Sequence, residues 1–387
     1  MRRSDKLQKL NELYPPEAIA SKRAFLDAFW EGKTINSVPF TLRRRDVPLG
    51  YDQNEFEMGY FAHEQVLDAQ LDDILLKASI CDDYIPILIT GNSPYYLSIA
   101  FGTRWEKLNK GALVSHPVIY NVEELGKLGI PDYEKLPQSP FTKCMDRIDF
   151  FLEATKSLIP LALPDPQGPM SLACQLWDQQ ELFISIHTQP EAVHMIMRIC
   201  TDAIIGFFNY LFRRFGREHF SCAHCHPYIY KKEASGIAVS EDMFGVLSPE
   251  TLKEFLLPYL QELQSRFGPL LLHSCGDCSR KFGILKELHG LAGVHFGQTD
   301  IRSVLPEQVK DLCLLSPNDW ENCEQIANYV LHLKRNHLRG WVQIHTIQGL
   351  IDQKGESVSY QQWADVARFL QKICRENRQI EHLKEGK

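Results

Sequence analysis

A short segment in the second half of the chain carries two side chains of the kinds that bind zinc. It runs His273-Ser274-Cys275-Gly276 and follows an apolar stretch. In a β-strand, residues i and i+2 project from the same face, so His273 and Cys275 are expected to point the same way. An open zinc site needs three protein ligands and one position for substrate or water. A His-x-Cys pair can also simply fill a core, and the spacing alone leaves both interpretations open.

A second cluster lies in the stretch Phe220-Ser-Cys-Ala-His-Cys-His226. As a strand it would place Cys222, His224 and His226 on one face and Cys225 on the other. These residues are candidates for a further zinc ligand, and Cys222/Cys225 with Cys275/Cys278 has the composition of a four-cysteine structural site. The gap between the two pairs is long for such a site. The alternative is that the histidines line a polar pocket.

Four carboxylates follow apolar, strand-like segments and are candidates for contact with substrate. They are Asp165, Glu241, Asp242 and Asp300. A carboxylate at the carboxyl end of a barrel strand is typical of a substrate contact or an acid–base group. For Glu241 and Asp242 the alternative is capping of the helix that follows, although Ser248 is better placed to do this.

Strand-like runs alternate with helical patterns along most of the chain. This alternation predicts an α/β fold with a parallel sheet, and eight strands predict a closed (β/α)8 TIM barrel. The eight predicted strands are Val38–Arg43, Ile85–Thr90, Leu158–Pro164, Phe220–His226, Leu270–Cys275, Gly293–Gly297, Leu312–Ser316 and Trp341–Thr346. Residues 1–33 are predicted to be helices preceding the barrel, which would occupy 34–387. Residues 91–140, rich in glycine and proline, are predicted to be an insertion after the second strand, over the active face.

Helices are indicated by apolar residues at three- and four-residue steps. The clearest helix follows Ser248, which can cap it, with Pro249 in the first turn, a kink expected at Pro258 and an end at Gly268-Pro269. The other predicted helices are His63–Ala78, Phe141–Lys156, Pro190–Phe215, Asn322–Arg335 and Ser359–Glu376.

The composition is that of an ordinary globular protein. Its 387 residues are 44% hydrophobic and carry a net charge of −7, which offers no basic surface for nucleic acid or an anionic membrane. No apolar run approaches the ~18 residues needed to cross a bilayer, and the charged N-terminus lacks the pattern of a signal peptide. We therefore expect a cytoplasmic protein. Most of the eleven cysteines are scattered through apolar segments, as expected of reduced, buried thiols.

Several motifs, taken in order, resemble the uroporphyrinogen decarboxylase superfamily. They are Leu163-Pro-Asp-Pro-Gln-Gly-Pro169, Gly236-Ile-Ala-Val-Ser-Glu-Asp-Met243, Leu247-Ser-Pro-Glu250, Phe255-Leu-Leu-Pro-Tyr259, Phe267-Gly268 and His273-Ser-Cys-Gly276. Weaker similarity extends towards both ends of the chain. Each motif is short, and the resemblance rests on their order and spacing across roughly residues 158–300. It implies the same barrel fold that the strand pattern predicts.

Within that superfamily the chain is more similar to the zinc methyltransferases than to the decarboxylases. Decarboxylases grip a tetrapyrrole with an N-terminal Arg-Gln-Ala-Gly-Arg motif and use no metal, whereas the matching region here reads Thr41-Leu-Arg-Arg-Arg-Asp46. The methyltransferases carry His-x-Cys on the strand that here holds His273 and Cys275. They usually add a cysteine near the last strand, where this chain reads Gly340-Trp-Val-Gln-Ile-His345. By strand alternation Trp341, Gln343 and His345 share one face, so His345 is the candidate third ligand; the alternative is that His345 contacts substrate.

The resemblance implies exchange of a methyl group with a corrinoid protein. Zinc would either hold a thiol acceptor as thiolate or polarise a small-molecule methyl donor. The cobalamin would be carried by a separate corrinoid protein, and we expect neither nucleic acid nor membrane as a partner. The alternatives are a decarboxylase acting on a related substrate and a non-enzymatic barrel that binds a tetrapyrrole or a metal.

Overall fold

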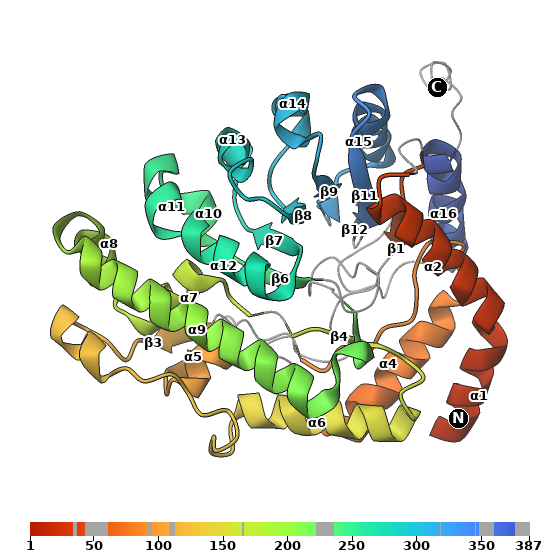
Figure 1. Ribbon diagram of the computed structural model, residues 1–387. Helices are drawn as coiled ribbons and strands as arrows, with labels where there is room; N and C mark the ends of the chain where they lie inside the picture. The colour runs from red at the N-terminus through yellow and green to blue at the C-terminus, as the bar shows by residue number, and fades with distance from the viewer. Residues whose placement is uncertain are drawn as a thin grey trace.

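The computed structural model describes residues 1–33, 37–42, 61–91, 95–107, 113–164, 166–221, 236–317, 319–344, 346–347 and 360–375. The strands of its largest sheet lie in the middle of the molecule, with helices around them (Figure 1). The strands are β1 Phe40–Leu42, β2 Arg104–Lys107, β3 Leu113–His116, β4 Leu161–Ala162, β5 Phe220–Ser221, β6 Ile237–Ser240, β7 Leu270–Ser274, β8 Leu291–Phe296, β9 Cys313–Leu315, β10 Asp319–Trp320, β11 Arg339–Ile344 and β12 Thr346–Ile347.

The α-helices surround these strands. They are α1 Arg3–Leu13, α2 Pro16–Trp30, α4 His63–Lys77, α5 Tyr96–Ala100, α6 Pro140–Thr155, α7 Pro169–Leu176, α8 Gln179–Thr188, α9 Pro190–Phe215, α10 Met243–Val246, α11 Pro249–Phe255, α12 Leu257–Phe267, α13 Phe282–Leu285, α14 Pro306–Val309, α15 Cys323–Arg335 and α16 Tyr360–Arg375. Short 3₁₀ turns are η1 Val122–Lys127, η2 Arg217–His219, η3 Ser279–Lys281 and η4 Ile301–Ser303.

Six strands form one parallel sheet in the order β1-β11-β9-β8-β7-β6. Parallel strands require crossover connections, and most of the connections in this sheet contain helices, as the alternating pattern predicted. The α/β class and the parallel arrangement are thus confirmed.

Further pairs extend this arrangement without forming one continuous ladder. Strand β4 pairs parallel with β5, and isolated parallel bridges join Leu88 to Leu161 and Gln167 to Ser240 of β6. The predicted strand Ile85–Thr90 consists of that single bridge at Leu88. The closed eight-stranded barrel therefore stays a prediction.

Strand β6 was not among the eight predicted strands. All four of its residues are buried, and each pairs with a residue of β7, ending with Ser240 opposite His273. The segment is apolar and strand-like in the sequence, but it is short and follows closely after the predicted strand Phe220–His226, and the eight-strand prediction did not include it. This missed strand turns out to position part of the candidate site.

The two faces of the sheet pack against different partners. The outer face carries side chains such as Leu272, Val294 and Val342, which belong to the large core shared with the surrounding helices. The inner face carries a smaller apolar cluster that includes Leu271, Leu315 and Trp341, and α2 contributes Leu26 and Phe29 to it. Helix α2 therefore covers the apolar end of the interior, and the predicted N-terminal helices in residues 1–33 are confirmed as α1 and α2.

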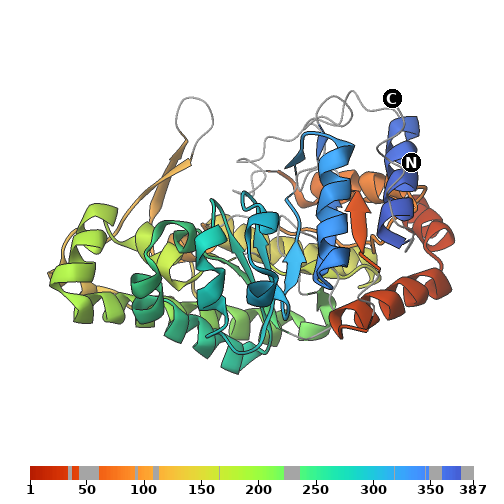
Figure 2. The same ribbon diagram turned by 90° about the horizontal axis from the view of Figure 1, so that it is seen from above.

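Helix ends agree closely with the local sequence signals. Predicted helix Pro190–Phe215 is α9 with the same bounds, and Ser248 caps α11 by accepting a hydrogen bond from the Thr251 N–H. The expected kink at Pro258 is a break at Leu256 between α11 and α12, because a proline ring clashes with the carbonyl four residues earlier. In the 91–140 segment, α5 and η1 flank the antiparallel hairpin β2–β3, which extends away from the body of the molecule (Figure 2).

Helix α9 is long and apolar enough, by length and composition alone, to cross a membrane. The sequence analysis had expected no such segment. In the fold, 56% of its most apolar 18-residue window is buried, and its inner face includes Val193, Phe207 and Leu211. A buried core helix meets the same criterion, and α9 packs against α7, α8 and α12.

Candidate metal centre

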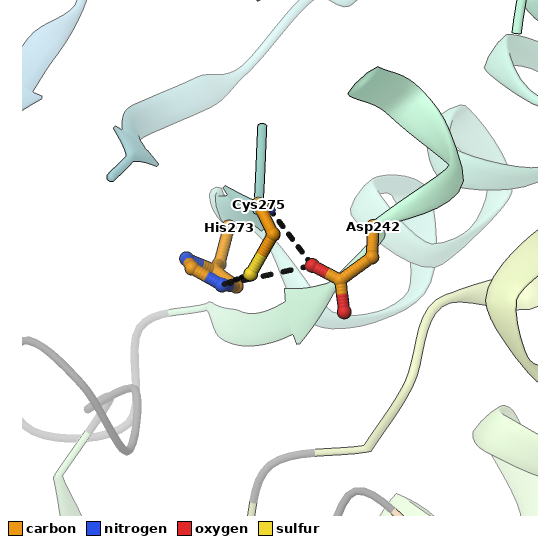
Figure 3. Close-up of side chains that lie close together, drawn as sticks. All are labelled: Asp242, His273 and Cys275. Atoms are coloured by element: carbon orange, nitrogen blue, oxygen red, sulfur yellow. Dashed lines mark hydrogen bonds and ion pairs between the residues drawn. The ribbon is translucent and has the colours of Figure 1, made fainter. Parts of the chain in front are cut away.

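Asp242, His273 and Cys275 converge at the carboxyl ends of β6 and β7 (Figure 3). One ligand atom from each lies within 4.8 Å of the other two. The Cys275 Sγ is 3.5 Å from the His273 Nε2, and that nitrogen is 3.7 Å from the Asp242 Oδ1. Among the described residues this is the group of three whose chemistry suits a metal ion.

Strand β7 presents His273 and Cys275 to the interior, as the sequence predicted. Leu271 belongs to the inner apolar cluster, and the inward positions on a strand recur every second residue. His273 is buried, whereas Cys275, one residue beyond the end of β7, is exposed. The thiol is thus open to solvent while the imidazole is held in the protein.

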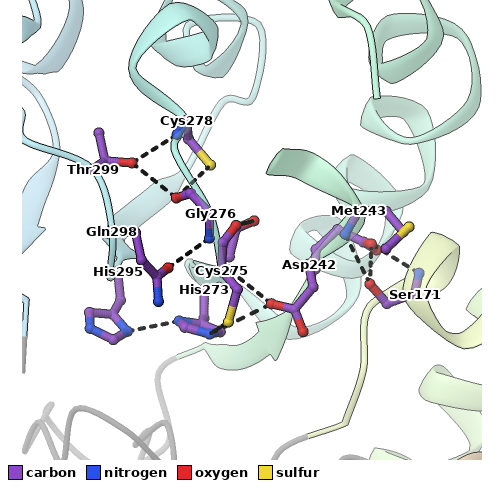
Figure 4. Close-up of polar contacts among 12 residues, drawn as sticks. Ser171, Asp242, Met243, His273, Cys275, Gly276, Cys278, His295, Gln298 and Thr299 are labelled. Atoms are coloured by element: carbon purple, nitrogen blue, oxygen red, sulfur yellow. Dashed lines mark hydrogen bonds and ion pairs between the residues drawn. The ribbon is translucent and has the colours of Figure 1, made fainter. Parts of the chain in front are cut away.

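The backbone after β7 is fixed by side chains from neighbouring loops (Figure 4). Asp242 Oδ1 accepts a hydrogen bond from the Cys275 N–H at 2.8 Å, and Gln298 Oε1 accepts one from the Gly276 N–H at 2.7 Å. Gly276 has a φ of +84°, a conformation that glycine adopts without steric cost. These contacts fix where the thiol of Cys275 is presented.

His273 forms a buried pair with His295 of β8. Their Nδ1 atoms lie 2.8 Å apart and their rings are stacked, with centroids 4.8 Å apart. One Nδ1 must carry the proton and the other must accept it. When the His273 Nε2 serves as a ligand, its Nδ1 carries the proton and donates to His295. Sequence reasoning missed this residue, although a histidine in a predicted strand next to His-x-Cys was a signal that could have found it.

Asp242 is predicted from the sequence as an acid–base or substrate residue, and the structure places it within metal-binding distance of His273 and Cys275. It follows β6 by two residues, and the Ser240–His273 register brings the end of β6 beside the end of β7. The sequence places Asp242 after a strand-like segment but does not show that this segment pairs with β7, so it gives no reason to place Asp242 next to Cys275.

Glu241 faces away from this cluster into the protein. Its side chain is fully buried and accepts hydrogen bonds from the backbone N–H groups of Met170 and Ser171 and from the Ser171 hydroxyl. Burial is the largest cause that raises the pKa of Glu241 to about 8, and the neighbouring Asp242 contributes in the same direction. The carboxyl group therefore anchors the N-terminus of α7, where helical N–H groups lack intrahelical partners.

The other predicted residues have varied positions. Asp300 caps η4 and pairs with the Arg302 guanidinium, which lowers the pKa of Asp300. Cys278 is buried, which raises the pKa of its thiol, and it lies outside the three-residue group. Asp165 and His345 lie outside the described residues, as do Cys222, Cys225, His224 and His226.

Comparison with known proteins gives one informative result. No family model matches the chain, and no curated protein matches it significantly. Among solved structures, a methyltransferase from Methanosarcina mazei superposes with a TM-score of 0.61 over 90% of this chain and 98% of its own, at 14% sequence identity. The chain shares its fold with a known methyltransferase. At this identity the likeness extends to the fold and not to the identity of the substrate.

Proposed function

We propose that the protein is a zinc-dependent methyltransferase, which exchanges a methyl group between a corrinoid protein and a small-molecule donor or a thiol acceptor. The observation that carries the proposal is the convergence of Asp242, His273 and Cys275 at the strand ends. The fold shared with a methyltransferase supports the reaction class. The resemblance of the motifs supports zinc, the corrinoid partner and a cytoplasmic location.

The distances between the three side chains fit a tetrahedral zinc ion. Zinc–sulfur and zinc–nitrogen bonds of about 2.3 and 2.0–2.1 Å imply a sulfur–nitrogen separation of about 3.6 Å, and the corresponding nitrogen–oxygen separation is about 3.4 Å. The observed values are 3.5 and 3.7 Å. For these two pairs the ligand atoms need to move only a few tenths of an ångström. The Cys275 sulfur and a carboxylate oxygen of Asp242 lie within 4.8 Å of each other, and zinc would bring them to about 3.6 Å.

The residues around the ion would each have a distinct role. His273 would bind through Nε2 while its Nδ1 proton is held by His295, the arrangement that usually orients a metal-bound histidine. A Cys275 thiolate and an Asp242 carboxylate would together neutralise a divalent ion. The fourth position would be open to substrate, where zinc stabilises a bound thiol as thiolate or acts as a Lewis acid.

The third ligand has two candidates. Asp242 is the residue that the described geometry favours, since its Oδ1 lies 3.7 Å from the His273 Nε2 and accepts a hydrogen bond from the Cys275 backbone N–H. His345 remains the candidate predicted from the sequence, one residue beyond the end of β11.

We also propose that the strands close into a (β/α)8 barrel. The bridge from Leu88 to Leu161, the bridge from Gln167 to Ser240, and the hydrogen bond from the Asp83 N–H to the Phe40 carbonyl each join neighbouring segments between β6 and β1. These contacts lie between β6 and β1, the two edge strands of the six-stranded sheet, which a closed barrel would have to connect. The inner apolar cluster packed by α2 is the interior expected of such a barrel.

Metal content and methyl transfer test the proposed function together. Purified protein should contain close to one zinc per chain and should transfer methyl groups between methylcobalamin and a thiol. Elemental analysis measures the first, and the change in cobalamin absorption measures the second. Protein that neither contains zinc nor binds it after reconstitution would refute the proposal.

A further inference from the structure

We infer that Gln343 is a specificity residue, whose side-chain amide binds a hydroxyl or carboxamide group of the substrate. The inference rests on the proposed function, which places the reacting end of the substrate at Asp242, His273 and Cys275. It goes further by naming a second contact and the chemistry of the group that fills it.

The side chain of Gln343 points into the interior of the strands. Trp341 belongs to the inner apolar cluster, and Gln343 is the next inward position on β11. Its Cα partner on β1 is Thr41, whose hydroxyl accepts a hydrogen bond from the Trp341 indole. The contact between Thr41 and Trp341 and the pairing of Thr41 with Gln343 therefore indicate that the Gln343 side chain also points inward.

Strand register places Gln343 at the same position along its strand as Cys275. Along the sheet His273 pairs with His295, His295 with Leu315, and Leu315 with Trp341. Cys275 is two residues after His273 on its strand, and Gln343 is two residues after Trp341 on its own, so both have the same offset from this row of paired residues. The two strands are separated by three strand spacings, or about 14 Å along the sheet, and the distance across a curved interior is shorter.

The amide of Gln343 is fully buried, and neither its nitrogen nor its oxygen has a hydrogen-bond partner among the residues that the structure describes. A buried amide without partners is strongly unfavourable, and such groups are rare in folded proteins. A ligand that supplies both a donor and an acceptor would remove the penalty. A leucine or methionine would fill the position without incurring it.

The backbone of Gln343 is held in place by its neighbours. Its N–H donates to the Ser316 hydroxyl at 2.8 Å, and its carbonyl accepts from the Trp320 indole at 3.1 Å and from the Ser316 hydroxyl at 3.2 Å. Three hydrogen bonds with side chains therefore hold the backbone of Gln343, whose own side chain has no hydrogen bond to any described residue. A rigid backbone that presents an unsatisfied polar group is the arrangement expected of a preorganised binding residue.

The chemistry around the amide limits the group that it binds. The described neighbours Thr41, Ser316 and Trp341 are uncharged. The amide presents N–H donors beside one acceptor oxygen, so a carboxylate would satisfy the nitrogen and repel the oxygen, and an ammonium group would do the reverse. A hydroxyl or a carboxamide satisfies both.

The first experiment compares the stability of the ligand-free wild type with Gln343→Met, a variant of similar shape that lacks the amide. If the amide awaits a ligand, the variant should keep or raise the melting temperature by a few degrees, because an unsatisfied group is removed. If the amide has a structural role, the melting temperature should fall. A fall of several degrees would overturn the inference, whether or not the protein binds zinc.

The second experiment measures how the binding of straight-chain thiols to the zinc-loaded protein depends on their length. Thiols of about two to ten carbons with a terminal hydroxyl are compared by calorimetry with methyl-terminated thiols of equal length. At the length that reaches Gln343, the hydroxyl should improve binding to the wild type by about tenfold, and the advantage should fall to within about twofold in Gln343→Met.

The results distinguish failure of the inference from failure of the proposed function. Equal discrimination by the wild type and Gln343→Met at every length, or no discrimination at all, would overturn the role of Gln343 while leaving the zinc site intact. Failure of every thiol to bind to the metal would contradict the proposed function instead. The melting temperatures would then decide the role of Gln343 alone.

Discussion

Cys275 differs from the other two candidate ligands in being exposed, at the end of a strand and beside a loop held by Asp242 and Gln298. An exposed side chain contributes little to packing, and its replacement is therefore expected to affect the metal without affecting the fold. His273 is buried against His295, so its replacement would disturb both. This contrast makes Cys275 the better residue with which to test metal binding.

Cys275→Ser should lower zinc affinity by at least about 100-fold, because it removes the thiolate from an open site that needs three protein ligands. The metal-free variant should unfold within about 2 °C of the metal-free wild type. Competition with a chromogenic chelator measures the affinity. Cys81→Ser is the matched control, since Cys81 is also exposed but lies outside the metal-ligand group. Equal affinity in both variants would exclude Cys275 as a ligand.

Asp242→Asn and His345→Ala should differ in their effect on zinc. Asparagine keeps an oxygen that can accept from the Cys275 N–H but removes the negative charge, so this variant should lose zinc affinity by about tenfold or more. We expect His345→Ala to lose less. The reverse order would assign the third position to His345, and a His345→Cys variant should then restore binding.

A buried carboxyl group also holds the edge of the sheet at β1, which is the edge opposite β6. Asp82, before the Leu88 bridge, is buried, and its two oxygens accept hydrogen bonds from the N–H groups of Leu42 and Tyr84. The Asp82 carboxyl group therefore ties the end of β1 to the segment that follows α4. Burial is the main cause that raises the pKa of Asp82 to about 6.

The raised pKa of Asp82 predicts a pH-dependent stability. Because the folded protein binds the proton more tightly than the unfolded chain, this contribution is complete below about pH 4 and is lost as the pH rises through 6. Two pKa units correspond to about 3 kcal/mol. Urea unfolding between pH 4 and 7 measures it. Asp82→Asn should reduce the fall in stability over this range by about 3 kcal/mol, leaving the part that comes from Glu241, whose pKa is also raised. The substitution should also cost about 1–3 kcal/mol, since one backbone N–H loses its acceptor. An unchanged slope in the variant would contradict the assignment.

The molecule as a whole shares its fold with a methyltransferase, but one fold supports many reactions. Two short segments of the chain differ from what is expected of a decarboxylase. The segment Thr41–Asp46 lacks the arginine motif that the decarboxylases use, and the strand ends carry a metal-type ligand set.

Incubation with uroporphyrinogen should therefore yield no loss of carboxylate, because the motif that would grip an acidic tetrapyrrole is absent. Separation of the porphyrins by chromatography after oxidation measures the product. An authentic decarboxylase assayed in parallel is the control. Formation of coproporphyrinogen would favour the decarboxylase alternative over the methyltransferase.

The features that could be predicted from sequence were those set by neighbours in the chain. Helix α9 has the predicted bounds, and Ser248 caps α11, because a capping hydroxyl and a repeating apolar stripe act within a few residues. Strand alternation likewise placed His273 and Cys275 on one inward face. Each of these results needs only the local geometry of a helix or strand.

The rest of the site depends on contacts between distant segments. Asp242 reaches Cys275 because β6 pairs in register with β7, and His295 reaches His273 because β8 lies on the other side. The apolar segment that forms β6 is strand-like in the sequence, but its local pattern does not indicate which strand is its neighbour or in which register they pair. The choice of ligand types was visible in the sequence, whereas their convergence was decided by which strands pair and in which register.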